Sequence, residues 1–234
     1  MSIARFGNNI GTVSGLVAMD YGEYTEPIAK WAFDNDDGED TSGNGYDLIA
    51  DSGSGYSDPS YGPALVGDGA FWNKNSGMIN SSFYTGFNNE LSISLWYNVS
   101  TGDGVDWGFQ LYEDGTVSPL QYLFGLYGQV YFQLSKNTIP DPYYGIYAPV
   151  IRDGAWHNVI ATYENDEMKL YQDNILIDSS IVADVSIYGS GTINNQVYYL
   201  GPSDPSIWTD QIYVFDKALN LKEILYLWNG GLGI

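Results

Sequence analysis

The chain has 234 residues, no cysteine, 44% hydrophobic residues and a net charge of −21 from 29 acidic and 8 basic residues. This length and composition suit one all-β sandwich with a full core, and the lack of cysteine excludes thiol catalysis and cysteine-based zinc sites. The charge argues against nucleic acid, which is gripped by clusters of Lys and Arg, and against an anionic membrane surface.

Residues 1–27 are rich in glycine and show no sustained hydrophobic period. We predict that they form an N-terminal arm that docks on a neighbouring subunit, because a sparse apolar segment can fill a partner's groove or add a strand to a sheet edge. The alternative is that the arm folds back as an extra edge strand of its own sandwich. The arm lacks the apolar core of a secretory signal peptide, so we expect cytosolic synthesis or a signal already removed.

From residue 28 onward, short strand patterns recur with turn residues between them, as in antiparallel sandwiches. The clearest is 91–99, where apolar residues alternate with others and predict a strand with one apolar face. Further strands are predicted at 107–112, 121–126, 129–134, 157–163, 168–171, 175–179, 196–200 and 211–215. Asp173 and Asn174 predict a tight turn, because both residue types tolerate positive φ.

One helix is predicted near the C-terminus. Asn220 can cap it, and Glu223 occupies the reciprocal position of a capping box. Its apolar residues share one side: Leu221, Ile224, Leu225 and Trp228. Gly230 and Gly231 end it, and we expect the helix to cover one end of the sandwich.

Ordered segments of the chain carry a family resemblance. They are 31–34 (WAFD), 40–45 (DTSGNG), 67–71 (GDGAF), 91–99, 153–159 (DGAWHNV), 170–173 (LYQD), 200–201 (LG) and 210–229. In this order they resemble the LamG-like, concanavalin A-like lectin/glucanase superfamily over about 29–233. The resemblance implies an all-β, two-sheet antiparallel jelly-roll sandwich over 28–234 with one short C-terminal helix.

An acidic loop follows the first of these segments: Asp34, Asp36, Asp37, Glu39 and Asp40. Calcium takes six to eight oxygen ligands, and a glycine-rich turn can supply carbonyls. The resemblance implies a structural calcium ion held at Asp34, Asn44 and Asp210. Gln211 stands where the family has a second acid, and the alternative is a solvated acidic loop with Asx turns.

Catalysis is not expected. The glucanases of this superfamily carry two glutamates at alternate positions of one strand, and this chain has no such spacing. Glu164, Asp166 and Glu167 fall in a predicted hairpin turn. His157 is the only histidine, has no nucleophile motif beside it, and is predicted to pack next to Trp156.

Two groups of tyrosines are candidate contacts for a glycan or a protein. Tyr56 and Tyr61 lie in one predicted loop, and Tyr143, Tyr144 and Tyr147 lie in the predicted loop 137–149. Exposed aromatic rings stack on sugars and also anchor protein interfaces. The alternative is that these rings lie flat on the domain's own surface.

These features predict a non-catalytic, lectin-like binding protein. We expect a phage virion surface subunit, such as a head-decoration or appendage protein, made in the host cytoplasm and contacting neighbouring subunits through its arm. A homo-oligomer and adhesion to cell-surface glycans are part of this expectation. The alternative is a stand-alone, extracellular bacterial carbohydrate-binding module or lectin.

Overall fold

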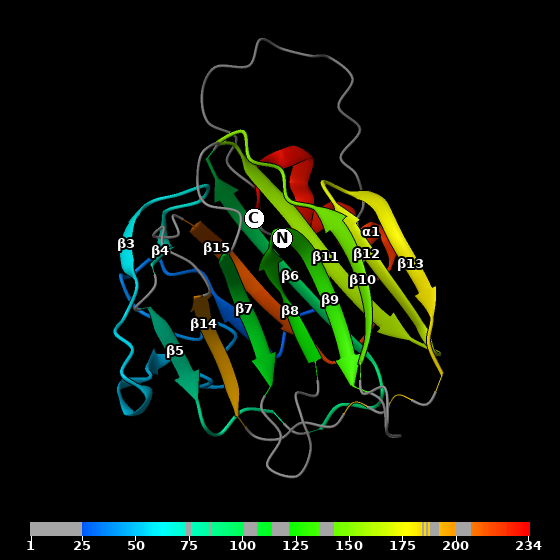
Figure 1. Cartoon of the computed structure of the whole chain (residues 1–234), viewed down its shortest axis with the longest axis horizontal. Helices are drawn as coiled ribbons and strands as arrows, with labels where there is room; N and C mark the ends of the chain where they lie inside the picture. The colour runs from blue at the N-terminus through cyan, green and yellow to red at the C-terminus, as the bar shows by residue number, and fades with distance from the viewer. Residues whose placement is uncertain are drawn as a thin grey trace, which may run out of the picture.

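The computed structural model describes residues 25–73, 76–84, 86–100, 107–113, 122–135, 143–183, 185, 187, 192–199 and 207–234. Two antiparallel sheets stack on each other, and one short helix lies outside them (Figure 1). This confirms the predicted all-β sandwich. The predicted arm lies outside the described residues except for its last three. In the part of the chain described, no helix is both long and apolar enough to cross a membrane.

The first sheet has eight strands in the order β13-β12-β11-β6-β15-β4-β3, with β1 also paired to β15. Its strands are β1 (Ala29–Trp31), β3 (Ser60–Pro63), β4 (Asp68–Trp72), β6 (Leu91–Val99), β11 (Trp156–Glu164), β12 (Glu167–Gln172), β13 (Ile175–Ile181) and β15 (Ile207–Phe215). Because strands distant in sequence, such as β6 and β15, pair in this sheet, the connections cross between the layers as a jelly roll requires.

The second sheet has seven strands in the order β10-β9-β8-β7-β14-β5-β2. Its strands are β2 (Ile49–Ala50), β5 (Gly77–Asn80), β7 (Trp107–Glu113), β8 (Tyr122–Tyr127), β9 (Gln129–Ser135), β10 (Tyr143–Pro149) and β14 (Ile193–Tyr199). The two sheets therefore share two edges: β13 and β10 end them on one side, and β3 and β2 end them on the other.

The predicted strands are confirmed, but β14 and β15 begin earlier in the chain than the pattern indicated. The predicted turn at Asp173 and Asn174 is also confirmed, with φ of 49° and 64°. Two loop predictions are wrong: residues 143–149 form strand β10, and Tyr61 lies in strand β3. The aromatic residues and the single glycine of β10 pair along β9 in regular antiparallel register, which favours a strand.

Strand β6 was predicted to have one apolar face, but it is buried on both faces, with only Asn98 partly exposed. One face lies in the core between the sheets. On the other, the Ser92 hydroxyl donates to the Lys217 carbonyl at 2.8 Å and accepts from the Leu219 N–H at 2.9 Å. The segment that leads to the helix therefore covers this face at Ser92, and it supplies the hydrogen-bond partners that a buried hydroxyl needs.

Helix α1 (Leu221–Trp228) begins with the predicted capping box: Asn220 Oδ1 accepts from the Glu223 N–H, and Glu223 Oε2 accepts from the Asn220 N–H. Its predicted apolar side is confirmed in part: Ile224 is buried, whereas Leu221 is 67% exposed. The helix also does not cover an end of the sandwich. Its buried side chains pack on the outer face of the first sheet, in a cluster with Ile160, Tyr171, Tyr213 and Phe215.

Candidate functional site

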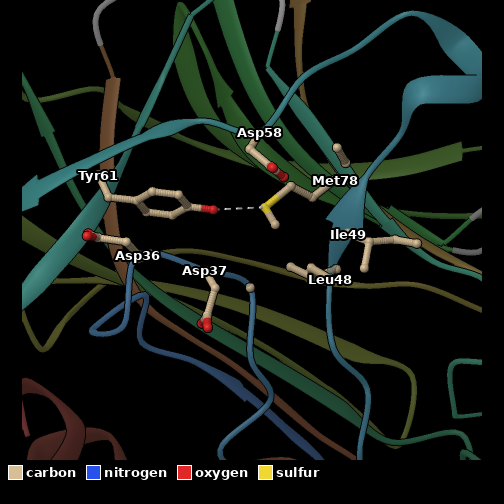
Figure 2. Close-up of a pocket in the computed structure, with 9 residues that line it drawn as sticks. Asp36, Asp37, Leu48, Ile49, Asp58, Tyr61 and Met78 are labelled. Atoms are coloured by element: carbon tan, nitrogen blue, oxygen red, sulfur yellow. Dashed lines mark hydrogen bonds between the residues drawn. The ribbon is translucent and has the colours of Figure 1, made fainter.

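A pocket of about 240 Å³ opens at the β2/β3 edge of the sandwich (Figure 2). Both sheets contribute to it, because β3 belongs to the first sheet and β2 and β5 belong to the second. Its principal lining side chains are three carboxylates, one aromatic ring and an apolar floor: Asp36, Asp37, Asp58, Tyr61, Leu48, Ile49 and Met78. None of the residues that line the pocket is basic.

Tyr61 is half-buried in this pocket, and its ring packs against Phe33 with the centroids 6.3 Å apart. Figure 2 shows its hydroxyl directed at the Met78 sulfur, which lies 3.9 Å away, with Asp58 and Asp37 on either side of that contact. Burial, followed by the nearby carboxylates, raises the pKa of Tyr61 well above its usual value. The hydroxyl therefore stays protonated. It can donate a hydrogen bond to a ligand in place of the one to Met78, since a thioether is a weak acceptor.

The acidic loop is held onto the pocket by a close backbone approach. The Leu48 N–H donates to the Gly38 carbonyl at 2.8 Å. A Cβ on Gly38 would collide with the Leu48 carbonyl oxygen and lie 2.6 Å from the Met78 Cε atom. Only glycine fits there, and its neighbours Asp36 and Asp37 reach the rim of the pocket as a result.

Two of the three predicted calcium ligands, Asp34 and Asp210, both accept hydrogen bonds from the turn between β3 and β4. Asp34 Oδ1 accepts from the Asp68 N–H at 3.2 Å, and Asp210 Oδ2 accepts from the Val66 N–H at 3.0 Å. Asp210 is fully buried, and its Oδ1 has no hydrogen-bond partner among the described residues. Burial, with the Asp34 charge as a further cause, raises the pKa of Asp210 to about 7 in spite of backbone hydrogen bonds that oppose the shift.

The third predicted ligand, Asn44, takes part in a different network. Its side-chain amide donates to the Ile28 carbonyl at 3.0 Å and to the Ser42 hydroxyl at 3.2 Å. The turn is organised by Asp40, whose carboxylate accepts the N–H groups of Lys30, Ser42 and Tyr46: an arrangement built on an Asx turn. Within the described ranges, no three acidic or histidine side chains converge as a metal cluster.

The predicted tyrosines fall at opposite edges of the sandwich. Tyr56 packs over Gly77 of β5, close to the pocket that Tyr61 lines. In β10, Tyr144 is partly buried against the core, whereas Tyr147 is 43% exposed and its hydroxyl accepts from the Gln133 amide at 3.0 Å. Tyr143 begins this strand, and its side chain lies outside the described part of the structure.

His157 is bound on both ring nitrogens. Its Nδ1 lies 2.8 Å from Asp173 Oδ2, and its Nε2 lies 3.1 Å from Asp153 Oδ1. Burial lowers the pKa of His157, but the hydrogen bonds and charges of the two carboxylates outweigh burial, so the pKa is raised. The ring also packs at 5.7 Å from that of Tyr97. The sequence predicted a packing role, and the two carboxylate partners add an electrostatic one.

Sequence reasoning missed the pocket as a unit. It singled out Asp36 and Asp37 as part of a calcium loop and Tyr61 as a surface aromatic, but not Asp58 or Met78. These residues come from four separate segments, so no local motif connects them. The signal available in the sequence was the glycine at position 38 within the acidic run, which marks a close backbone approach.

The fold and the site can now be compared with known proteins. A family model described as the concanavalin A-like lectin/glucanases superfamily matches residues 73–225, which is more than half of the chain. A comparison with curated protein sequences finds no match. The matched range begins after the loop and strands that supply most of the pocket, so of the lining residues only Met78 lies within it.

Similar solved structures include the binding domain of Paraclostridial Mosquitocidal Protein 1, with a TM-score of 0.70, 16% identity, and coverage of 87% of this chain and 52% of that one. The receptor binding domain of botulinum neurotoxin type G has a TM-score of 0.69, 14% identity, and coverage of 88% and 51%. The binding domain of botulinum neurotoxin DC, in complex with SialylT, has a TM-score of 0.70, 19% identity, and coverage of 87% and 51%.

The chain thus spans about half the length of each of these neighbours, and at such identities the likeness concerns the fold. The family match concerns the sequence itself and includes β5 through most of α1. The resemblance of the ordered segments is confirmed by both findings. The chain belongs to the concanavalin A-like lectin/glucanase superfamily, whose domains of this kind are lectin-like.

Proposed function

We propose that this protein is a non-catalytic carbohydrate-binding domain and that the pocket at the β2/β3 edge binds one unit of a neutral glycan. The observation that carries the proposal is the combination of Tyr61, three carboxylates and an apolar floor around one opening. Sugar hydroxyls donate to carboxylates, while aromatic and apolar surfaces cover the C–H faces of the ring. The volume of about 240 Å³ lies just below the usual range for small-molecule sites, which suits a single sugar unit.

The charge of the pocket favours a neutral sugar over an acidic one. Asp36, Asp37 and Asp58 belong to no ion pair formed among the described residues. An anionic sugar in the pocket would be repelled by all three. This distinguishes the present chain from its neighbour whose structure contains SialylT. The non-catalytic part of the proposal is supported by the lack of the glucanase glutamate spacing.

Binding of neutral and sialylated oligosaccharides, measured on a glycan array and by calorimetry, tests this proposal. Asp58→Asn and Tyr61→Ala should each weaken binding of the neutral ligand by about tenfold or more, as expected for loss of about 1.4 kcal/mol of contact. Glu164→Gln, at the β11–β12 turn, removes the same charge far from the pocket and should leave binding unchanged. Binding that is equal in all three variants, or restricted to sialylated glycans, contradicts the proposal.

We further infer that the domain is displayed on a phage virion surface, with the arm as its docking element. The absence of cysteine and the sparse apolar pattern of residues 1–27 support this over a stand-alone lectin. Co-purification with virus particles is the expected result, and removal of residues 1–20 should abolish it without lowering the melting temperature. A truncated protein that melts well below the full-length chain indicates an edge strand instead.

We also propose that Asp34 and Asp210 contribute oxygens to a structural calcium ion. The support is the buried Asp210 Oδ1, which lacks a hydrogen-bond partner among the described residues, and the second carboxylate close by. A hard cation prefers such oxygens, and its charge would offset the repulsion between them. Asn44 belongs to the Asp40 turn, so the remaining ligands would be carbonyl groups and water.

A further inference from the structure

The exposed large apolar side chains are concentrated at one edge of the sandwich. Among the described residues, eight such side chains are exposed: Ile49, Tyr147, Ile175, Leu176, Ile177, Ile181, Leu221 and Leu232. Four of them belong to the seven residues of β13, and two of these, Ile175 and Ile181, are 62% and 72% exposed. We call Ile175, Leu176, Ile177, Ile181 and Tyr147 the β13 edge.

Tyr147 joins this set through a contact between the two sheets. Its N–H donates to Asp178 Oδ2 at 3.0 Å, which links β10 at the end of one sheet to β13 at the end of the other (Figure 1). Asp178 is the only charged residue of β13, and this hydrogen bond directs its carboxylate toward β10. The β13 edge is therefore apolar apart from this one acid.

β13 also has an unpaired side. It pairs with β12 along one side and, in the described part of the chain, with no strand along the other. Natural edge strands usually carry proline, or lysine and other charged residues, which prevent pairing with a second chain. A bulge at Ile177 shifts the register between Leu170 and Tyr171, yet it places a further apolar side chain in solvent and not a charge.

Two acids near this edge are paired with basic side chains. Glu167 pairs with Lys169 at 2.6 Å, and Asp173 pairs with His157 at 2.8 Å. A chain with a net charge of −21 repels its own copies through any acidic face. At the β13 edge these two pairs lower that repulsion, and four exposed Ile and Leu side chains are available for burial against a second copy.

We propose that β13 pairs antiparallel with β13 of a second copy about a two-fold axis. In the resulting dimer, the first sheets of the two copies form one continuous sheet across the interface. An antiparallel strand on a two-fold axis is self-complementary, and it satisfies the outward backbone groups of both copies at once. The pocket edge, β2 and β3, lies at the other end of both sheets, so both pockets stay open in the dimer.

The first test is the mass of the purified full chain in solution, measured by light scattering and sedimentation over a range of concentrations. We expect a dimer that Leu176→Lys and Ile181→Lys convert to a monomer, with a dissociation constant raised at least a hundredfold. Leu221→Lys and Leu232→Lys are matched controls, because these side chains are comparably exposed at other places on the surface. Unchanged thermal melting of each variant monomer shows that the fold is intact.

The second test uses the absence of cysteine from the chain. Single cysteines at Ile177, Ser179 and Ile181 are oxidised, and disulfide-linked dimers are quantified. Antiparallel pairing about a two-fold axis brings one position close to its own copy, so cross-linking should peak at one of these positions and fall at the others. A wild-type chain that is monomeric at every concentration overturns the proposal, as does a dimer that Leu221→Lys or Leu232→Lys disrupts while the β13 variants do not.

Discussion

The two edges of the sandwich differ in whether the carboxylates near them form ion pairs. Near the β13 edge, Asp173 and Glu167 each lie beside a basic side chain. At the β2/β3 edge, Asp36, Asp37 and Asp58 surround an open pocket and take part in no ion pair among the described residues. Among the described residues, the carboxylates around the pocket are unpaired, whereas two of those near the β13 edge are paired.

The same contrast extends to one titratable side chain in each region. Asp210, beside the pocket edge, has a carboxylate oxygen without a partner, and its pKa is raised to about 7 by burial and by Asp34. His157, beside the β13 edge, is held between two carboxylates that raise its pKa. Ionisation of Asp210 destabilises the folded state, whereas ionisation of His157 stabilises it. Changes of pH and substitutions at these two residues therefore distinguish the two regions.

The largest effect is expected at Asp210. Because its folded pKa lies above the unfolded value of 3.8, the folded state holds a proton that the unfolded state releases, so stability falls as pH rises from about 4 to about 7. Asp210→Asn imitates the protonated acid and should remove this slope of about 1.4 kcal/mol per pH unit. In chelator, the variant should match the wild type near pH 4 and exceed it by a few kcal/mol at pH 8, measured by urea unfolding.

Calcium provides the control for that experiment. If the ion binds at Asp34 and Asp210, adding it at pH 8 should raise the melting temperature of the wild type with concentration, because the ligand binds only the folded state. The same addition should leave Asp210→Asn and Asp34→Ala nearly unchanged. A wild type that gains stability with rising pH in chelator contradicts the burial of an ionisable Asp210.

The second effect concerns Gly38, which holds the acidic loop against the pocket floor. Gly38→Ala should destabilise the protein by about 1–3 kcal/mol, because a Cβ there meets the Leu48 backbone and the Met78 side chain. The displaced loop should also weaken glycan binding. Gly53→Ala is the matched control, since a Cβ at that position has its nearest contact at 3.7 Å. Equal stability of the two variants in chemical unfolding contradicts the close approach.

The sequence predicted what depends on local patterns. The capping box of Asn220 and Glu223 spans three residues, and the turn at Asp173 and Asn174 depends on residue type alone, so both were confirmed. The covered outer face of β6 was not predicted, because alternation records polarity and not which polar residue finds a partner.

Features assembled from distant segments also escaped prediction. The pocket draws on residues from position 36 to 78, and the family model matches the chain only from residue 73. The exposed strand β13 was predicted over 175–179, but a short run that begins with three apolar residues is equally typical of a buried strand. Exposure is set by the order of strands in the sheet, and that order is a property of the whole chain.

The smallest effect is expected at His157. Its folded pKa lies above the unfolded value of 6.5, so its stabilising contribution is complete below that pH and is lost as pH rises through the folded pKa. His157→Gln should therefore cost about 1 kcal/mol at pH 5 and much less at pH 9, because exposed partners such as Asp153 contribute weakly. Urea unfolding at the two pH values measures this difference, and Asp210→Asn, which changes the opposite region, should keep it. A His157→Gln penalty that grows with pH would show that the imidazole acts through packing on Tyr97 and not through its charge.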